Sequence, residues 1–299
     1  MGWSSWEKVT GQGLDFTDII YEKKYHAELT GGVARVTINR PEKYNAYTSH
    51  TADEMFRAFY DASHDPRIGA VVLTGAGDHF CTGGDVVWEQ WASREQFYWH
   101  SPTNRVLRIC RKPVIAMVKG FAIGGGHHIA YFCDFTIAAD NAVFGQNGPR
   151  VSSPADGFLV QYLVRVVGAK KAREIWMLCR RYSASEALEL GLINKVVSLH
   201  RLEEEVDRWC EELLLASPSC LEILKASFDW ELDQLSPICT FVNWLKPDLF
   251  DSPEGKEGPA AFIERRKPQF WKLRMQEAQA IQGLRGPAPP PPQPPKKGP

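Results

Sequence analysis

The sequence lacks the features that mark several large classes of protein. No segment approaches the roughly 20 consecutive apolar residues that a membrane-spanning helix needs, and the first 13 residues hold no apolar run typical of a secretory signal. Charge of one sign is also missing, because 35 basic and 36 acidic residues leave a formal net charge of −1. A chain without a strong overall field has no general attraction for nucleic acids or anionic membranes. We therefore predict a cytoplasmic protein that binds neither nucleic acid nor membrane.

Cysteine patterns that indicate disulfides or zinc sites are absent as well. The seven cysteines are odd in number and irregularly spaced, and no two of them form a CxxC pair. Reduced thiols in a core fit this pattern better than a disulfide framework or zinc ligands. With 44% hydrophobic residues, the chain has enough apolar material for a sizeable core, which excludes a wholly disordered or collagen-like protein.

Hydrophobic periodicity predicts strands mainly in the first half of the chain and helices in the second. A helix is expected between the capping residues Thr48 and Ser49 and the break at Asp65-Pro66. Strands are expected at 19–28, 33–39, 70–74, 113–118, 135–139, 142–144 and 193–197. Further helices are expected at 158–167, 169–179, 183–190, 202–215, 218–229 and 255–265. This order predicts an α/β core with a helical appendage.

Two glycine clusters each follow a predicted buried strand. The first is FCTGGD at 80–85 and the second is GFAIGGGHH at 120–128. Neither fits the dinucleotide pattern G-x-G-x-x-G with an acidic residue about 20 positions on, nor a phosphate loop that ends in Gly-Lys-Ser/Thr. Glycine turns let an acyl group approach the backbone closely and leave N–H groups free to donate. One cluster alone is explained as a tight turn, but two on neighbouring strands would form an oxyanion hole with two donors.

These clusters, in this order and setting, resemble the crotonase (enoyl-CoA hydratase/isomerase) superfamily over roughly residues 18–275. The matching elements are NRP at 39–41 with NA at 45–46, CTGGD at 81–85, PVIA at 113–116, IGGG at 123–126, CD at 133–134, FGQ at 144–146 and ALELGL at 187–192. The resemblance implies an α/β fold, a spiral of ββα units followed by helices that build a trimer, often paired into a hexamer. On this basis the chain divides into an N-terminal extension (1–17), the spiral core (18–197), a helical oligomerisation region (198–275) and a proline-rich, disordered tail (276–299).

The resemblance also implies the substrate and its site. The family binds acyl-CoA, so that coenzyme A enters as part of the substrate and no separate cofactor or metal is expected. Two backbone N–H groups, which here belong to Gly84 and Gly125, hold the thioester oxygen, and losing one such donor typically lowers the rate about 10²–10³-fold. Other contacts with the acyl group or CoA are assigned to Lys43, Asn45, Ala46, Thr82, Gly83, Asp85, Val86, Gln146, Gly148, Phe250 and Arg265. In the family, the position of Arg265 reaches the CoA phosphates of a neighbouring subunit.

Departures from the family pattern limit which of the family's reactions this chain can catalyse. Hydratases carry glutamates at the positions of His128 and Gly148, so the acid and base of simple hydration are missing here. The segments FGQNGPRVSS at 144–153, KKAREIW at 170–176 and RRKP at 265–268 resemble a narrower branch. That branch holds 1,4-dihydroxy-2-naphthoyl-CoA synthase and the ring-opening 2-ketocyclohexanecarboxyl-CoA and 6-oxocyclohex-1-ene-1-carbonyl-CoA hydrolases. Some of the synthases hold bicarbonate at the positions of Gln146 and Gly148, where a small anion is conceivable here too.

Within this branch, the sequence departs from the synthase at two positions, where Ala155 replaces an aspartate and Phe250 replaces a tyrosine. The acidic residue is displaced to Asp156, in a Ser-Pro-Ala-Asp-Gly run similar to that of the oxocyclohexene hydrolase. That hydrolase, however, keeps an acidic residue where His128 stands. We predict hydrolytic ring opening of a cyclic β-oxoacyl-CoA. Two alternatives stay open: a lyase or synthase that forms the C–C bond by Claisen-type closure, and a non-enzymatic relative.

In the predicted reaction, Asp156 or His128 activates the water that attacks the ring ketone, and Ser153 orients the ketone or the water. Each residue also has a purely structural explanation. Asp156 fits a helix cap equally well, His128 fits a hydrogen-bonded core histidine, and Ser153 fits a turn residue. Arg265 is otherwise an exposed helix charge. His127 and His128 would point about 100° apart on a helix, which argues against a shared metal.

Overall fold

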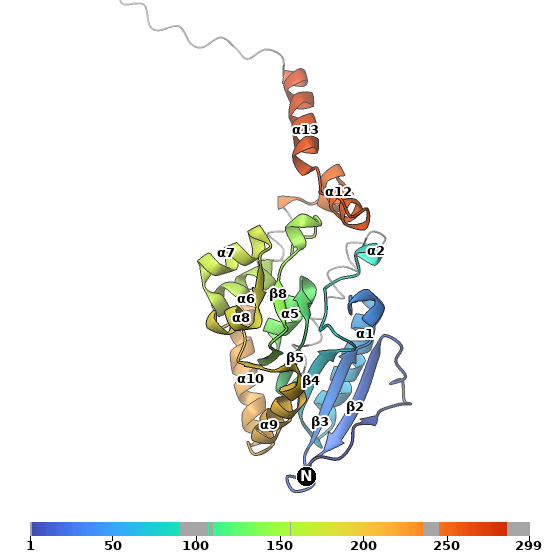
Figure 1. Cartoon of the computed structure of the whole chain (residues 1–299), viewed down its shortest axis with the longest axis vertical. Helices are drawn as coiled ribbons and strands as arrows, with labels where there is room; N and C mark the ends of the chain where they lie inside the picture. The colour runs from blue at the N-terminus through green and yellow to red at the C-terminus, as the bar shows by residue number, and fades with distance from the viewer. Residues whose placement is uncertain (1, 90–106, 108–109, 156, 236–244, 286–299) are drawn as a thin grey trace, which may run out of the picture.

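The structure, a computed structural model, describes residues 2–89, 107, 110–155, 157–235 and 245–285 (Figure 1). Its elements are, in chain order, β1 (Glu7–Lys8), β2 (Ile19–Tyr25), β3 (Gly32–Ile38), η1 (Pro41–Lys43), α1 (Ser49–His64), β4 (Ile68–Gly75), α2 (Val86–Glu89), β5 (Val114–Val118), β6 (Phe121–Ile123), α5 (Gly125–Phe132), β7 (Phe135–Ala139), β8 (Val143–Gly145), η2 (Gly148–Arg150), α6 (Gly157–Val167), α7 (Ala169–Leu178), β9 (Arg181–Ser183), α8 (Ala184–Glu189), β10 (Lys195–Val197), η3 (Leu199–Arg201), α9 (Leu202–Leu214), α10 (Pro218–Asp233), η4 (Leu249–Asp251), α12 (Pro253–Ile263) and α13 (Phe270–Arg285).

Two sheets form the frame of the described chain. The larger has seven strands in the order β1-β2-β3-β4-β5-β7-β10, and the smaller has the order β6-β8-β9. Strands β2 and β3 form the predicted antiparallel hairpin, with Ile19 opposite Ile38, whereas β3, β4, β5, β7 and β10 pair in parallel. Parallel neighbours need a crossover connection, which is why helices separate β3 from β4 and β5 from β7 in the sequence.

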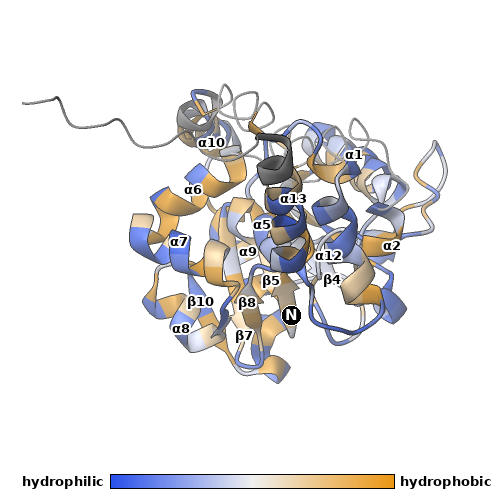
Figure 2. Ribbon diagram, turned by 90° about the horizontal axis from the view of Figure 1, so that it is seen from above, coloured by the Kyte–Doolittle hydropathy of each residue, from blue (hydrophilic) through white to orange (hydrophobic). Residues whose placement is uncertain are grey.

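Alternate residues of the central strands face two separate cores. In β4, Val71 and Leu73 belong to the main core, which includes residues of α1 and α5, whereas Ala70 and Val72 pack with residues of α9 on the other face. A strand that is buried on both faces reads as a continuous apolar run, which explains the lack of alternation in 70–74. Figure 2 colours β5, β7 and α6 mainly as hydrophobic, in agreement with the residues that these elements contribute to the two cores.

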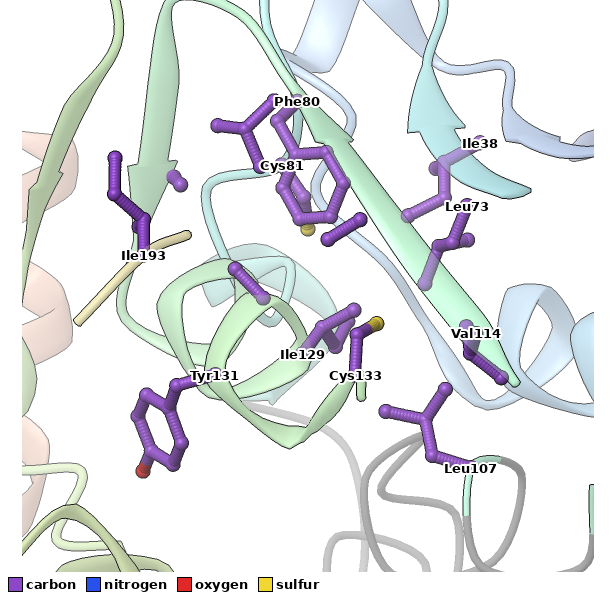
Figure 3. Packing of buried hydrophobic residues seen from close by; sticks show 14 of the residues in the cluster. Ile38, Leu73, Phe80, Cys81, Leu107, Val114, Ile129, Tyr131, Cys133 and Ile193 are labelled. Carbon is purple, nitrogen blue, oxygen red and sulfur yellow. The ribbon is translucent and has the colours of Figure 1, made fainter. Parts of the chain in front are cut away.

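Helix α5 lies inside the main core and carries the second glycine cluster. In Figure 3, Ile129 of α5 and Cys133, directly after this helix, face the strands that carry Leu73 and Val114, with Phe80 on the adjoining side. All of these side chains are buried. The start of α5 is therefore fixed by packing against the larger sheet, and the glycine turn before it is fixed as well.

The C-terminal helices correct one predicted boundary. We expected the proline-rich tail to begin at residue 276, but α13 continues to Arg285. Residues 276–285 contain Gln, Glu, Ala, Leu and Arg, which favour helix, and the prolines begin only at Pro287. Residues 286–299 lie outside the described part. Figure 1 shows α12 beside α2, and α13 standing away from the sheets.

Two further observations concern the described residues as a set. None of their helices combines the length and apolar character required to cross a membrane. They contain no group of three or more side chains able to hold a metal ion. The cysteines among them are free thiols, and Cys239 lies outside the described residues.

The two-faced burial of β4 leads to a test of the fold. Leu73 is fully buried in the main core, so Leu73→Ala should lower the free energy of unfolding by about 2–5 kcal/mol through lost burial and a residual cavity. The matched change Leu215→Ala, at a side chain 73% exposed, should alter it by less than about 0.5 kcal/mol. Urea unfolding followed by circular dichroism measures both, and equal effects would contradict the described core.

Candidate active site

The two glycine clusters meet because the segments before them pair as neighbouring strands. Cys81 forms a parallel bridge with Ala122. The Cys81 N–H donates to the Phe121 carbonyl at 2.9 Å, and the Ile123 N–H donates back to the Cys81 carbonyl at 3.0 Å. This pairing brings the turn at 82–85 against the turn at 124–126, as the sequence predicted.

Both turns require glycine, because there is no space for a Cβ atom and because the backbone adopts positive φ values. A Cβ on Gly83 would lie 2.7 Å from the Gly125 nitrogen, and a Cβ on Gly126 would lie 2.0 Å from the Cys81 carbonyl oxygen. Gly83 and Gly124 also have φ values of 96° and 57°, which residues with a side chain rarely adopt. The close contact between the turns therefore depends on the missing side chains.

Two backbone N–H groups are left without a protein acceptor at this contact. Among the described residues, neither the Gly84 nor the Gly125 N–H donates a hydrogen bond to another group. Gly125 is the first residue of α5, where the opening N–H groups have no partner within the helix and the helix dipole favours negative charge. The arrangement can therefore provide two donors to one oxygen atom.

Both glycines line a cavity of about 860 Å³. Most residues predicted from the sequence line it too. They are Lys43, Ala46, Thr82, Gly83, Gly84, Asp85, Val86, Gly125, His128, Gln146, Gly148, Ser153 and Arg265. Arg265, with a left-handed φ of 54° just after α12, lines the cavity of its own chain. Gly148, which the resemblance aligns with the second glutamate of hydratases, lines the cavity without a side chain.

Two predicted contact residues do not line the cavity. Asn45 is fully buried and uses its side chain on the backbone, accepting from the Arg40 N–H at 3.0 Å and donating to the carbonyls of Ala76 and His79 at 2.8 and 2.7 Å. It positions the loop that follows β3 and is not placed to touch a ligand. Phe250 lies in η4, away from the cavity lining. Asp156 lies outside the described residues, directly before α6.

Tyr47, Glu89 and Arg181 are among the cavity residues that were not predicted as site residues. The Tyr47 hydroxyl lies against Gly125, 2.2 Å from where a Cβ would stand, and the Glu89 Oε1 lies against Gly84, 1.9 Å from where its Cβ would stand. Arg181 donates from Nη1 to the Gln146 carbonyl. Tyr47 directly follows the matching NA element at 45–46, whereas neither Glu89 nor Arg181 belongs to a motif that the sequence analysis used.

Gln146 joins both histidines of α5 in one hydrogen-bond chain. His128 Nε2 donates to Gln146 Oε1 at 3.2 Å, and Gln146 Nε2 donates to His127 Nδ1 at 2.9 Å. Since an amide oxygen only accepts, the proton of His128 stays on Nε2, and His127 carries its proton on an Nε2 without a partner among the described residues. Both histidines are therefore buried and hydrogen-bonded to one amide, as the structural explanation of His128 expected, while His128 also lines the cavity.

Burial disfavours the charged form of four ionisable groups in this region. It lowers the pKa of His127 to about 3 and that of His128 to about 4, with His128 and Arg181 adding to the shift of His127. Burial, followed by the negative charge of Asp85, raises the pKa of Glu89 to about 7. The pKa of Tyr47 is also raised, first by burial. Next to the free N–H groups, the hydroxyl of Tyr47 and the ring of His128 are therefore neutral at pH 7, whereas Asp85 supplies a negative charge.

The two buried histidines should make the fold sensitive to acid. Their pKa values lie below the 6.5 of an unfolded histidine, so below pH 6.5 these histidines bind protons in the unfolded chain but stay unprotonated in the folded chain. The contribution of the two histidines to the free energy of unfolding is therefore fully present above pH 6.5. It falls as the pH drops, by about 2 kcal/mol for each histidine at pH 5. Urea unfolding at pH 7 and pH 5 measures the loss. His127→Asn, which keeps an acceptor for Gln146, should reduce it, whereas His200→Gln at an exposed site should not; an unchanged loss in His127→Asn would contradict the assignment.

Comparisons with known proteins agree with this geometry. The enoyl-CoA hydratase/isomerase family model matches residues 28–273. A crystal structure of an enoyl-CoA hydratase from Mycobacterium avium subsp. paratuberculosis is 29% identical, with 86% of this chain and 99% of that chain covered and a TM-score of 0.73. A Geobacillus kaustophilus structure titled as an enoyl-CoA hydratase subunit is 30% identical, with 85% and 98% covered and a TM-score of 0.65. A structure of methylmalonyl-CoA decarboxylase in complex with 2-nitronate-propionyl-CoA is 25% identical, with 80% and 94% covered and a TM-score of 0.71.

The matched family model spans most of the chain, and the solved structures share its α/β architecture. The crotonase-like fold expected from the two glycine turns is confirmed. The chain belongs to the enoyl-CoA hydratase/isomerase family, whose members are acyl-CoA enzymes.

Proposed function

We propose that this protein opens a cyclic β-oxoacyl-CoA by hydrolysis and holds the resulting thioester enolate between the N–H groups of Gly84 and Gly125. The observation that carries the proposal is the pair of donors without a protein acceptor, on two turns in contact at one cavity. Fixed backbone donors in a site poor in water stabilise an oxygen on which negative charge develops. Cleavage of the C–C bond next to a thioester develops its charge on that oxygen.

The residues around the donors favour C–C cleavage over simple hydration. Gly148 offers no carboxylate, and His128 is held neutral where hydratases carry a glutamate. A relative named methylmalonyl-CoA decarboxylase, which by its name removes a carboxyl group from an acyl-CoA, was solved with a nitronate ligand. A nitronate has the charge and shape of an enolate, so this relative supports enolate chemistry in the same framework.

The proposed steps balance with water as the second reactant. A base takes a proton from water as its oxygen attacks the ring ketone. The C–C bond then breaks and its electron pair becomes the thioester enolate, which gains a proton at the α-carbon and leaves a dicarboxylic mono-CoA thioester. Of the two bases considered from the sequence, a pKa of about 4 makes His128 a weak proton acceptor at neutral pH. Asp156 is supported by its neighbours Pro154 and Ala155, which line the cavity with Ser153.

The cationic residues of the cavity suit the CoA moiety. Lys43 and Arg265 come from the loop after β3 and from the end of α12, and both line the cavity that holds the free donors. We assign them to the CoA phosphates, which prefer cationic partners. A small anion beside Gly148 would find the second amide hydrogen of Gln146 and the guanidinium of Arg181.

We also propose that the protein forms a trimer or a dimer of trimers, because α10 exposes the large apolar side chains of Ile223, Leu224, Phe228 and Trp230.

A direct assay tests the reaction. The protein is incubated with 2-oxocyclohexane-carbonyl-CoA and 6-oxocyclohex-1-ene-carbonyl-CoA, and the products are followed by mass spectrometry. We expect one water to be added and the ring to be opened. Recovery of unchanged substrate, with no binding of either thioester, would exclude the proposal and favour a non-enzymatic relative. Loss of water with a new ring bond would favour the synthase.

The role of Asp156 has a separate test. Asp156→Asn keeps the size and the capping oxygen of the side chain but removes the base. If Asp156 activates the water, the rate should fall well beyond tenfold, whereas a helix cap should keep more than about a tenth of it, equivalent to less than ~1.4 kcal/mol of transition-state stabilisation. The comparison of kcat/KM for the two proteins decides between the two roles.

A further inference from the structure

A carboxyl group that the proposed mechanism leaves unused lies beside one of the two free donors. Glu89 ends the single turn of α2, and its N–H donates to the Asp85 carbonyl at 2.8 Å. Its side chain returns over Gly84, so that a Cβ added there would be 1.9 Å from Oε1 and 2.9 Å from Cδ. The carboxyl therefore lies against the same glycine whose N–H is free.

The turn that carries Glu89 is held by its neighbour. Asp85 Oδ1 accepts from the Val87 and Trp88 N–H groups at 3.1 and 3.4 Å, and Asp85 Oδ2 accepts from Arg40 Nη2 at 3.1 Å. The Asp85 N–H in turn donates to the Tyr47 carbonyl. Asp85 is thus occupied with positioning α2, whereas the carboxyl of Glu89 makes no hydrogen bond or ion pair with another described residue.

The surroundings of Glu89 suit a group that alternates between acid and carboxylate. Burial and the like charge of Asp85 raise its pKa to about 7. The other ionisable groups that line its cavity come from the loop after β3, α5, β9 and the end of α12; they are Glu42, Lys43, Tyr44, Tyr47, His128, Arg181 and Arg265. A general acid or base works best with a pKa near the working pH, which holds for Glu89 and not for His128.

The position of Glu89 fits one atom of the substrate. A thioester oxygen between Gly84 and Gly125 has its α-carbon two bonds away, so a carboxyl against Gly84 is close to that carbon. We propose that Glu89 is a catalytic residue that transfers the proton at the α-carbon of the bound acyl-CoA. In ring opening, the O–H bond of the carboxyl breaks as the α-carbon takes the proton, and the carboxylate regains the proton that the attacking water released.

The same group would also work in reverse on an acyl-CoA that has no ring. Its carboxylate takes an α-hydrogen, and the electron pair of the C–H bond forms the enolate. The hydrogen on the carboxyl then exchanges with solvent, and the enolate collapses with solvent hydrogen on the α-carbon. This inference rests on the enolate chemistry of the proposed function, but the exchange needs neither a ring nor Asp156.

Deuterium uptake into butanoyl-CoA therefore tests Glu89 apart from ring opening. The full-length protein is incubated with butanoyl-CoA in D₂O, and uptake at the α-carbon is measured by mass spectrometry. Glu89→Gln should lower the exchange rate about 10²–10⁴-fold, the usual contribution of a general acid or base. Glu89→Asp should retain more activity than Glu89→Gln, and Glu189→Gln, at an exposed residue of α8, should match the wild type.

The pH profile separates a catalytic role from a structural one. Removal of the α-hydrogen needs the carboxylate, so kcat/KM of the wild type should rise as the pH approaches about 7 and level off above it. The residual exchange of Glu89→Gln should lack this inflection, and the wild-type profile stays informative even if that variant folds poorly. Wild-type exchange that Glu89→Gln leaves unchanged would overturn the role of Glu89 and leave the enolate site intact. Wild-type ring opening without exchange would also overturn it, whereas failure of both reactions would overturn the proposed function as well.

Discussion

The pairing of Cys81 with Ala122 is the contact on which the site depends. These two residues join a loop that leaves the larger sheet after β4 to the first strand of the smaller sheet. Their register decides which glycine faces which, since a shift of one residue in a strand exchanges the two faces. With the observed register, Gly83 contacts the Gly125 nitrogen and both free N–H groups reach one cavity. The packing of α5 and β4 matters to function mainly because it holds this register.

The close approach of the two turns also determines the charges around them. Segments that pack this tightly exclude water, and the loss of water disfavours every charged form. The result is the same for three chemically different groups, because Tyr47 and Glu89 are pushed toward their protonated forms while His128 is pushed toward its neutral form. The enolate oxygen would therefore meet fixed backbone dipoles that need no rearrangement as charge develops. The cations that line the cavity come from other segments, as expected if they bind the CoA phosphates.

Hydrophobic periodicity predicted most of the elements, because a strand or helix that packs on a core must repeat its apolar residues at a fixed interval. Residue type predicted the glycine turns for a similar reason, since no other residue fits there. The role of Asn45 could not be predicted in this way. An asparagine in a family motif has the same appearance whether its amide touches a ligand or ties two loops, and only the partners at Ala76 and His79 distinguish the two roles.

Glu89 and Phe250 escaped prediction for other physical reasons. Helix α2 has four residues, which is too short for a periodic pattern, so the sequence contained no sign that a side chain at position 89 would return to Gly84. Phe250 depends on how η4 and the last helices lie relative to the cavity, a long-range property that local residue patterns do not record. In both cases the sequence does not determine how a short segment is oriented relative to the cavity.

The hydrogen-bond chain through Gln146 limits which residues can handle protons. His128 must keep its proton on Nε2 to donate to Gln146, so a second proton would go to Nδ1 and create a buried imidazolium beside His127. A pKa of about 4 places this state roughly 3 kcal/mol higher than for a solvated histidine. Neither α5 histidine is therefore an effective base at neutral pH. If the cavity performs the proposed chemistry, carboxylates are better suited than these histidines to move its protons, and among the described carboxylates the side chain of Glu89 lies against Gly84.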